Sequence, residues 1–174
     1  ISAEVGAQIL NNAELGNINF SLVDKTGSIT PKYDHADRHL DAIVSHALVN
    51  KNLIEKQNLK IVVDAINSSG AVFVPILLKK LGIQEQNIIV LNGEVNGKFA
   101  HNPEPLPQHL SQLSAAVISN KADLGISVDP DVDRLVLVCE DGSMFGEEYT
   151  LVAVADYILR NKKGVAISNL SSSA

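Results

Sequence analysis

The order of apolar and polar positions along the chain predicts alternating helices and strands. In residues 2–14 and 33–49 apolar side chains recur every three to four positions, a spacing typical of amphipathic helices. Short apolar runs bounded by turn residues indicate strands. Helices are also predicted at 71–81, 108–119 and 147–161, and strands at 60–64, 87–91, 123–128, 135–139 and 165–169.

This alternation favours the α/β class, because helices that separate strands act as crossovers between parallel neighbours. We expect a layered α/β/α domain with a mixed, mostly parallel sheet. The strands at 123–128 and 135–139 are separated only by a short acidic loop. That loop is too short for a helical crossover, so this pair is predicted to be antiparallel.

The turn Asn67–Gly70 precedes the helix predicted at 71–81, and Gly82 ends it. The two serine hydroxyls of this turn are suited to cap the helix. A phosphate cradle at the helix start is the alternative, but the turn lacks the glycine density of such loops. Pro75 lies inside the helical pattern and predicts a kink or a late start.

Composition limits the possible partners. The chain has 174 residues, of which 45% are hydrophobic, and a net charge of −6 without a Lys/Arg run. This argues against nucleic acid and anionic membranes, but a small phosphorylated ligand needs only a local positive site. No apolar run reaches the ~18–20 residues of a membrane span. The single cysteine, Cys139, fits a reducing, cytoplasmic location. Oligomeric state stays open.

The stretch V128-D-P-D-V-D-R134 places three carboxylates within five residues, at Asp129, Asp131 and Asp133. In an extended segment these side chains would point the same way. Crowded carboxylates raise one another's pKa, and a divalent cation such as Mg²⁺ removes that conflict. The alternative interpretation is a polar surface turn that begins with Asp-Pro.

Two metal-loop patterns come close to this stretch. An EF-hand would need glycine where Arg134 stands, and helices rather than strands on both sides, so it is rejected. A haloacid-dehalogenase-type phosphatase needs the motif Asp-x-Asp-x-Thr/Val after an apolar strand; Asp129 and Asp131 satisfy the first part, but Asp133 occupies the Thr/Val position. This phosphatase, with Asp129 as nucleophile, remains an alternative, as does a non-catalytic module that uses the acidic loop only for structure.

The run A122-D-L-G-I-S-V-D-P-D-V-D-R-L-V-L-V-C-E-D-G142 resembles the α-D-phosphohexomutase superfamily, whose metal loop has the form D-x-D-x-D-R between two strands. V62-V-D-A-I-N67 and F99-A-H-N-P-E-P-L-P107 resemble the first strand and the Pro-rich loop of the same family domain. Residues 146–159 and 165–172 resemble the start of the next family domain.

The resemblance implies a four-domain enzyme that interconverts hexose 1-phosphate and 6-phosphate through a phosphoserine and a bisphosphate intermediate. Asp129, Asp131 and Asp133 would hold Mg²⁺, and Arg134 would lie beside the transferred phosphoryl group. The rigid fork of arginine donors suits phosphate oxygens. A plain ion pair within the loop is the alternative for Arg134.

The resemblance also implies domain boundaries. Residues 1–44 would be the tail of the first family domain and a linker helix, 45–143 the metal-loop domain, and 144–174 the start of the next domain. The chain is therefore expected to be a piece of a longer protein. The isolated piece is expected to be inactive, and the sequence does not indicate which hexose phosphate the parent uses.

Several other motifs are weaker. A100-H-N-P103 imitates the family's Ser-His-Asn-Pro nucleophile loop, but alanine stands at the serine position. The serines at 171–173 have no base near them in the sequence. Gly146-Glu-Glu148 is interpreted as a helix start. His35 and His39 have the spacing of a zinc pair, but a solvated helix face is favoured because no third ligand is evident.

Overall fold

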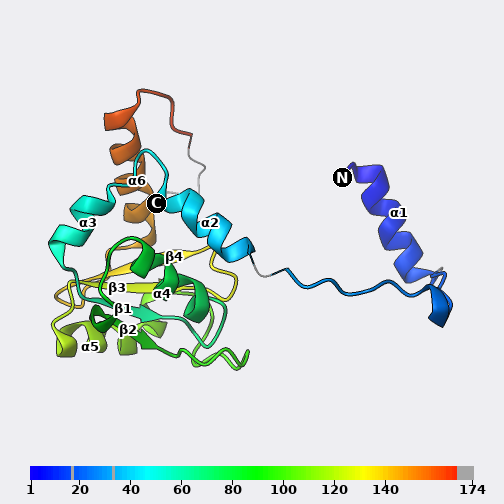
Figure 1. The fold of residues 1–174 in the computed structure, drawn as a ribbon, viewed down its shortest axis with the longest axis horizontal. Helices are drawn as coiled ribbons and strands as arrows, with labels where there is room; N and C mark the ends of the chain where they lie inside the picture. The colour runs from blue at the N-terminus through cyan, green and yellow to red at the C-terminus, as the bar shows by residue number, and fades with distance from the viewer. Residues whose placement is uncertain (17, 33, 168–174) are drawn as a thin grey trace. The chain divides into compact units, whose positions relative to one another are not determined.

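The computed structural model describes residues 1–16, 18–32 and 34–167 and divides into two compact units, Ile1–Tyr33 and Asp34–Ala174 (Figure 1). In the first unit, α1 (Ala3–Glu14) confirms the predicted helix, and the hydroxyl of Ser2 accepts the Val5 N–H at its start. A 3₁₀ turn, η1 (Val23–Lys25), follows. No residue of α1 is buried.

The second unit holds a four-stranded sheet in the order β2-β1-β3-β4. The strands are β1 (Ile61–Asp64), β2 (Ile88–Leu91), β3 (Leu124–Val128) and β4 (Leu135–Cys139). β1 pairs in parallel with both β2 and β3, and β3 pairs antiparallel with β4. The prediction of a mixed, mostly parallel sheet is confirmed, including the antiparallel pair.

Helices cover both faces of the sheet. Successive side chains of β1 point to opposite sides, so each face has its own apolar contacts with a helix. Ile61 and Val63 pack with Val74 and Leu78 of α4 (Gly70–Lys80). Val62 packs instead in a second cluster with residues of α5 (Ser111–Asn120). The result is the predicted α/β/α layering, with β1 fully buried at its centre.

The remaining elements of this unit are α2 (His35–Val44), α3 (Lys51–Gln57), the 3₁₀ turns η2 (Glu85–Asn87) and η3 (Pro107–His109), and α6 (Glu147–Asn161). The helix predicted at 33–49 ends early, because the His46 ring and carbonyl take the N–H groups of Leu48 and Val49. Ala47, an apolar residue within the predicted range, is exposed. The sequence prediction missed α3, which Asn50 caps through the Leu53 N–H.

Two further predictions fail. The late helix start at Pro75 is wrong, because Ser68 and Ser69 carbonyls already accept the N–H groups of Ala71 and Phe73. The strand predicted at 165–169 is absent over 165–167, where no strand runs alongside among the described residues, and positions 168–169 lie outside them. None of the described helices is both long enough and apolar enough to cross a membrane.

Candidate metal site at the carboxyl edge of the sheet

The candidate site lies where the three parallel strands end. The carboxyl ends of β1, β2 and β3 meet at one edge of the sheet, since Asp64 pairs with both Leu91 and Ser127. Ligand sites of α/β proteins gather at this edge, outside the strand ends. The loops that leave it are residues 65–69, 92–106 and 129–134.

The acidic stretch forms a tight turn rather than an extended segment. The Val132 N–H donates to the Asp129 carbonyl at 3.2 Å, and Val132 has a positive φ of 64°. The expectation that alternation along an extended chain aligns the acids is therefore wrong. The turn itself brings one carboxylate oxygen each of Asp129, Asp131 and Asp133 within 4.8 Å of one another.

Asp129 anchors this turn. Its side chain is only 6% exposed, and its Oδ1 accepts the backbone N–H groups of Asp133 and Arg134, both at 3.1 Å. Burial pushes the pKa of Asp129 upward, but these N–H donors and the hydrogen bonds with the other two acids outweigh it and lower the pKa. Asp129 is thus a fixed, ionised carboxylate.

Asp133 shows the cost of crowding. Its shared hydrogen bond with Asp129, together with repulsion from Asp131 and Asp129, raises the pKa of Asp133. Asp131 and Asp133 are both exposed. A cation at this position would relieve the repulsion, and three carboxylates are a donor set that suits a hard ion such as Mg²⁺. The residues present therefore fit the implied metal.

The serine turn before α4 holds the acidic turn in place. The hydroxyls of Ser68 and Ser69 donate to the Pro130 carbonyl at 2.9 and 2.5 Å. The prediction that these hydroxyls cap the helix is wrong, because Ser69 stands at the N-cap without a side-chain cap bond. Their donors face a loop that follows some sixty residues later, which the local sequence does not reveal.

Two β-branched residues in the loops at this edge of the sheet have unfavourable backbone angles. Ile66 and Val132 adopt positive φ angles of 49° and 64°, which β-branched residues avoid. Ile66 lies in the turn after β1, and Val132 lies in the acidic turn. Such outliers persist where the surrounding structure over-determines them, and they cluster at functional sites.

Arg134 is held by a residue from the Pro-rich loop. Its Nη1 donates to Oε1 of Glu104 at 2.9 Å, and this hydrogen bond raises the pKa of the already charged guanidinium. Both side chains are about half exposed. The alternative predicted for Arg134, an ion pair within its own loop, is thus replaced by a pair across two loops.

A buried pair beneath this loop escaped the sequence prediction. Asp64 is fully buried at the end of β1, and its Oδ2 lies 2.9 Å from Nε2 of His101. Its Oδ1 accepts the Ile66 N–H and the side-chain amide of Asn92. The only signal was a charged residue at the end of an apolar strand.

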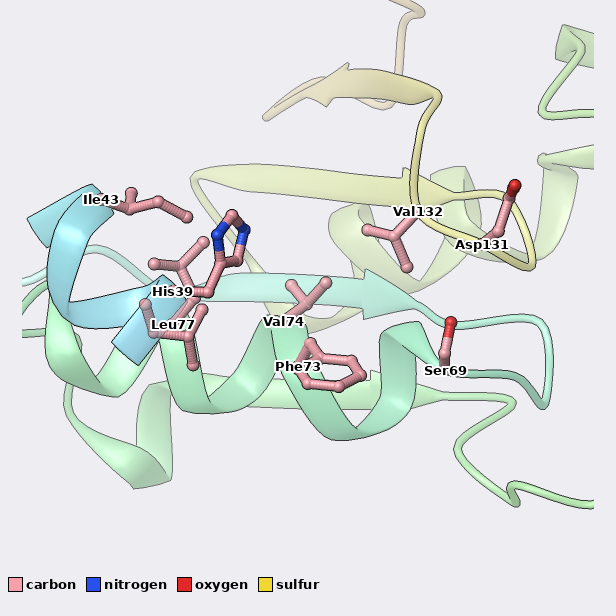
Figure 2. Close-up of a pocket in the computed structure, with 9 residues that line it drawn as sticks. His39, Ile43, Ser69, Phe73, Val74, Leu77, Asp131 and Val132 are labelled. Carbon is pink, nitrogen blue, oxygen red and sulfur yellow. The ribbon is translucent and has the colours of Figure 1, made fainter. Parts of the chain in front are cut away.

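A cavity of about 430 Å³ lies between α2, α4 and the acidic turn (Figure 2). Ser69 and Asp131 lie at one end and His39 and Ile43 toward the other. The lining residues are His39, Leu40, Ile43, Ser69, Phe73, Val74, Leu77, Asp131 and Val132. Because most of this lining is apolar, the polar chemistry belongs to the acidic turn rather than to the cavity.

Among the described residues, the other candidate motifs add no ligand to the acidic triad. His35 lies beside Arg38 on the exposed face of α2, and among the described residues the acidic triad is the one group of three metal-ligating side chains. Ala100 belongs to the Pro-rich loop. The serines at 171–173 lie outside the described residues. Gly146 stands at the N-cap of α6, as predicted for a helix start.

Comparison with known proteins assigns this architecture to a family. Residues 37–142 match the family model "Phosphoglucomutase/phosphomannomutase, alpha/beta/alpha domain II". A "Probable phosphoglucosamine mutase" of Methanosarcina barkeri is 35% identical over 134 residues, which cover 76% of this chain and 30% of that protein. A phosphoglucomutase of Neisseria gonorrhoeae is 33% identical over 150 residues, which cover 85% of this chain and 30% of that protein.

A solved structure gives the same result. The crystal structure of a phosphoglucomutase/phosphomannomutase family protein from Burkholderia thailandensis matches with a TM-score of 0.68 and 25% identity, covering 94% of this chain and 33% of that one. The chain thus spans about 30% of the length of the curated relatives it matches. It belongs to the phosphoglucomutase/phosphomannomutase family, and the part that the family model matches is the α/β/α domain II.

Proposed function

We propose that this chain is the metal-carrying part of a Mg²⁺-dependent phosphohexomutase. The whole enzyme would interconvert hexose 1-phosphate and 6-phosphate through a phosphoserine and a bisphosphate intermediate. The family membership and the names of the relatives support the reaction class. The observation that carries the metal role is the acidic turn, where three carboxylates converge within 4.8 Å.

In this proposal Asp129, Asp131 and Asp133 hold the metal ion. The two backbone N–H groups on Oδ1 of Asp129 fix the buried ligand, and the exposed Asp131 and Asp133 complete the set. When bound, Mg²⁺ would neutralise part of the charge on a phosphoryl group. Phosphoryl transfer depends mainly on positioning and charge stabilisation, which fixed ligands supply.

Arg134 is proposed to bind an oxygen of the transferred phosphoryl group. One of its two terminal nitrogens is engaged by Glu104. A guanidinium offers five N–H donors in a planar fork, so further donors remain for a phosphate oxygen. Its position directly after Asp133 in the sequence supports this role.

We propose further that the 174-residue chain is inactive alone. Its His-Asn-Pro sequence at 101–103 follows Ala100, so this loop offers no serine hydroxyl as nucleophile. His101 of the same loop is instead engaged with the buried Asp64. Turnover of glucose 1-phosphate by the isolated chain, measured in a coupled assay, would contradict this proposal.

The alternative of an Asp-nucleophile phosphatase is disfavoured by the geometry of Asp129. Oδ1 of Asp129 accepts two backbone N–H groups and is not free to attack phosphorus, and in this proposal the other carboxylate oxygen holds the metal ion. The family match also points away from this class. A beryllofluoride adduct on Asp129, detected by fluorine NMR, would revive it.

Calorimetric titration with Mg²⁺ tests the metal role directly. We expect one site in the wild-type chain, and about a tenfold or greater loss of affinity for Asp129→Asn, Asp131→Asn and Asp133→Asn, since each removes one charged ligand. Asp24→Asn, an exposed change in the other unit, is the matched control and should bind like wild type. Equal binding by all five proteins would overturn the proposal.

A further inference from the structure

The Pro-rich loop between β2 and α5 is tied to the buried end of β1 at several points. Asn67 accepts the Glu94 N–H through its side-chain oxygen at 3.2 Å and donates its amide to the Lys98 carbonyl at 3.0 Å. Its own backbone N–H donates to the Asn92 carbonyl at 2.6 Å. The first half of the loop is therefore fixed to the turn that follows β1.

The second half is fixed by His101. Nε2 of His101 lies 2.9 Å from Oδ2 of the fully buried Asp64, and Nδ1 lies 2.8 Å from the Asn102 carbonyl. Both ring nitrogens thus lie within hydrogen-bonding distance of an oxygen atom, which fixes the orientation of the ring. The side chain is only 16% exposed, so the pair is shielded from water and ions.

A short turn connects His101 to Glu104. The side-chain oxygen of Asn102 accepts the Glu104 N–H at 3.0 Å, which makes a tight turn from His101 to Glu104. The Glu104 carboxylate then accepts from Nη1 of Arg134 at 2.9 Å. A series of contacts therefore runs from the buried end of β1 to the arginine beside the acidic turn.

An isolated exposed ion pair orients its partners weakly, because both long side chains lose rotamer freedom in forming it. Here one partner is already restrained, since Glu104 sits on a turn that is anchored through His101. We propose that Asp64, His101 and Glu104 are positioning residues for Arg134, which hold its guanidinium in one orientation toward the acidic turn. The inference rests on the phosphate-binding role proposed for Arg134.

NMR of the 174-residue chain tests this directly, because the chain contains three arginines, Arg38, Arg134 and Arg160. We expect the wild-type Arg134 Nε–H signal to show the restricted motion of an ordered side chain, without Mg²⁺. Glu104→Ala and His101→Ala should each lower its heteronuclear NOE to that of a mobile side chain. Glu104→Gln, which keeps an acceptor oxygen at the same reach, should retain part of the order.

Matched controls come from the same region. Glu94→Ala and His109→Ala change like residues that do not contact Arg134, and both should leave its signal unchanged. Arg160, paired with Asp156 on α6, is an internal reference. A loop that only stabilised the fold would lower the melting temperature without altering Arg134 at 25 °C.

The outcomes separate the two proposals. An Arg134 signal that is unchanged in Glu104→Ala, or one that changes there but not in His101→Ala, overturns the positioning role. If His101→Ala does not fold, Asn102→Ala removes the acceptor of the Glu104 N–H at an exposed position and must give the same loss of order. Failure of the wild-type chain to bind Mg²⁺ would instead overturn the proposed function, while the arginine measurement still decides the positioning role.

Discussion

The strands β3 and β4 and the turn that joins them are built on opposite principles. Val128, Val136 and Val138 of the two strands are at most 4% exposed, and their backbones pair in register. The turn between them holds three carboxylates and a valine with φ of 64°. Burial of apolar side chains stabilises the strands, whereas the turn contains carboxylates that repel one another and a valine in an unfavourable backbone conformation.

The stability of this unit comes from the sheet and its helices rather than from the acidic turn. Apolar burial by the sheet and its two helix layers is distributed over many residues, and it fixes the ends of the turn. The turn adds local repulsion, seen in the raised pKa of Asp133. Such local conflict at a functional site is expected when the site is selected for ligand binding rather than for stability.

The largest expected effect on stability comes from a substitution in the apolar core that packs against the sheet. Leu113 of α5 is fully buried against β1 and β4 neighbours in the second core cluster. Leu113→Ala should lower the free energy of unfolding by about 2–5 kcal/mol through lost burial and the cavity left behind. Urea unfolding followed by circular dichroism measures it. Leu151→Ala, at a position 51% exposed on α6, is the control and should change stability little.

A smaller effect is expected where the helix layer meets the turn. A Cβ added to Gly70 would lie 2.5 Å from Cγ2 of Val128, the residue before Asp129. Gly70→Ala should therefore cost about 1–3 kcal/mol by overpacking and should weaken Mg²⁺ binding by displacing the turn.

Gly6→Ala is the matched control for that change, because a Cβ there meets nothing within 4 Å and Gly6 lies inside α1. It should leave Mg²⁺ affinity unchanged and slightly favour the helix. Wild-type affinity in Gly70→Ala, measured by calorimetry, would show that the contact between α4 and β3 does not position the turn.

The charge crowding of the turn predicts a pH dependence. Because the pKa of Asp133 is raised, the folded chain retains this proton to a higher pH than the unfolded chain does. Its contribution to stability is present below the unfolded pKa of about 3.9 and is lost as the pH rises through the raised folded pKa. Mg²⁺ should compensate that loss only after the proton has left.

We therefore expect the rise in melting temperature caused by saturating Mg²⁺ to be greatest near pH 7.5 and to shrink as the pH falls through the pKa of Asp133. Thermal unfolding at a series of pH values, with and without the metal, measures it. Asp133→Asn removes the titrating group and should flatten this dependence. A Mg²⁺ effect that grows on acidification would contradict the assignment.

The smallest effect has the opposite sign to the first two. Asp131→Asn removes one of the charges that repel Asp133, so the metal-free chain should melt about 1 °C higher. The same change should weaken Mg²⁺ binding. A lower melting temperature, found by scanning calorimetry in the presence of a chelator, would show that Asp131 stabilises the turn and that repulsion is not what limits it.

Some of this protein was readable from residue order alone. Hydrophobic periodicity predicted every strand of the observed sheet and the antiparallel pairing of β3 with β4, because these depend on short-range pattern and loop length. The cluster Asp129, Asp131 and Asp133 was readable because its members are neighbours in sequence. Their metal role stays a prediction, as do that of Arg134 and the domain boundaries at 44/45 and 143/144.

Only the tertiary structure decided how the site is held together. Ser68 reaches Pro130 across 62 positions, His101 reaches Asp64 across 37, and Arg134 reaches Glu104 across 30. No local pattern encodes these partners, because each pair meets only when parallel strands bring their carboxyl ends to one edge of the sheet. The sequence alone therefore determined which carboxylates and which arginine lie together in one loop, and the tertiary structure decided which distant residues contact that loop.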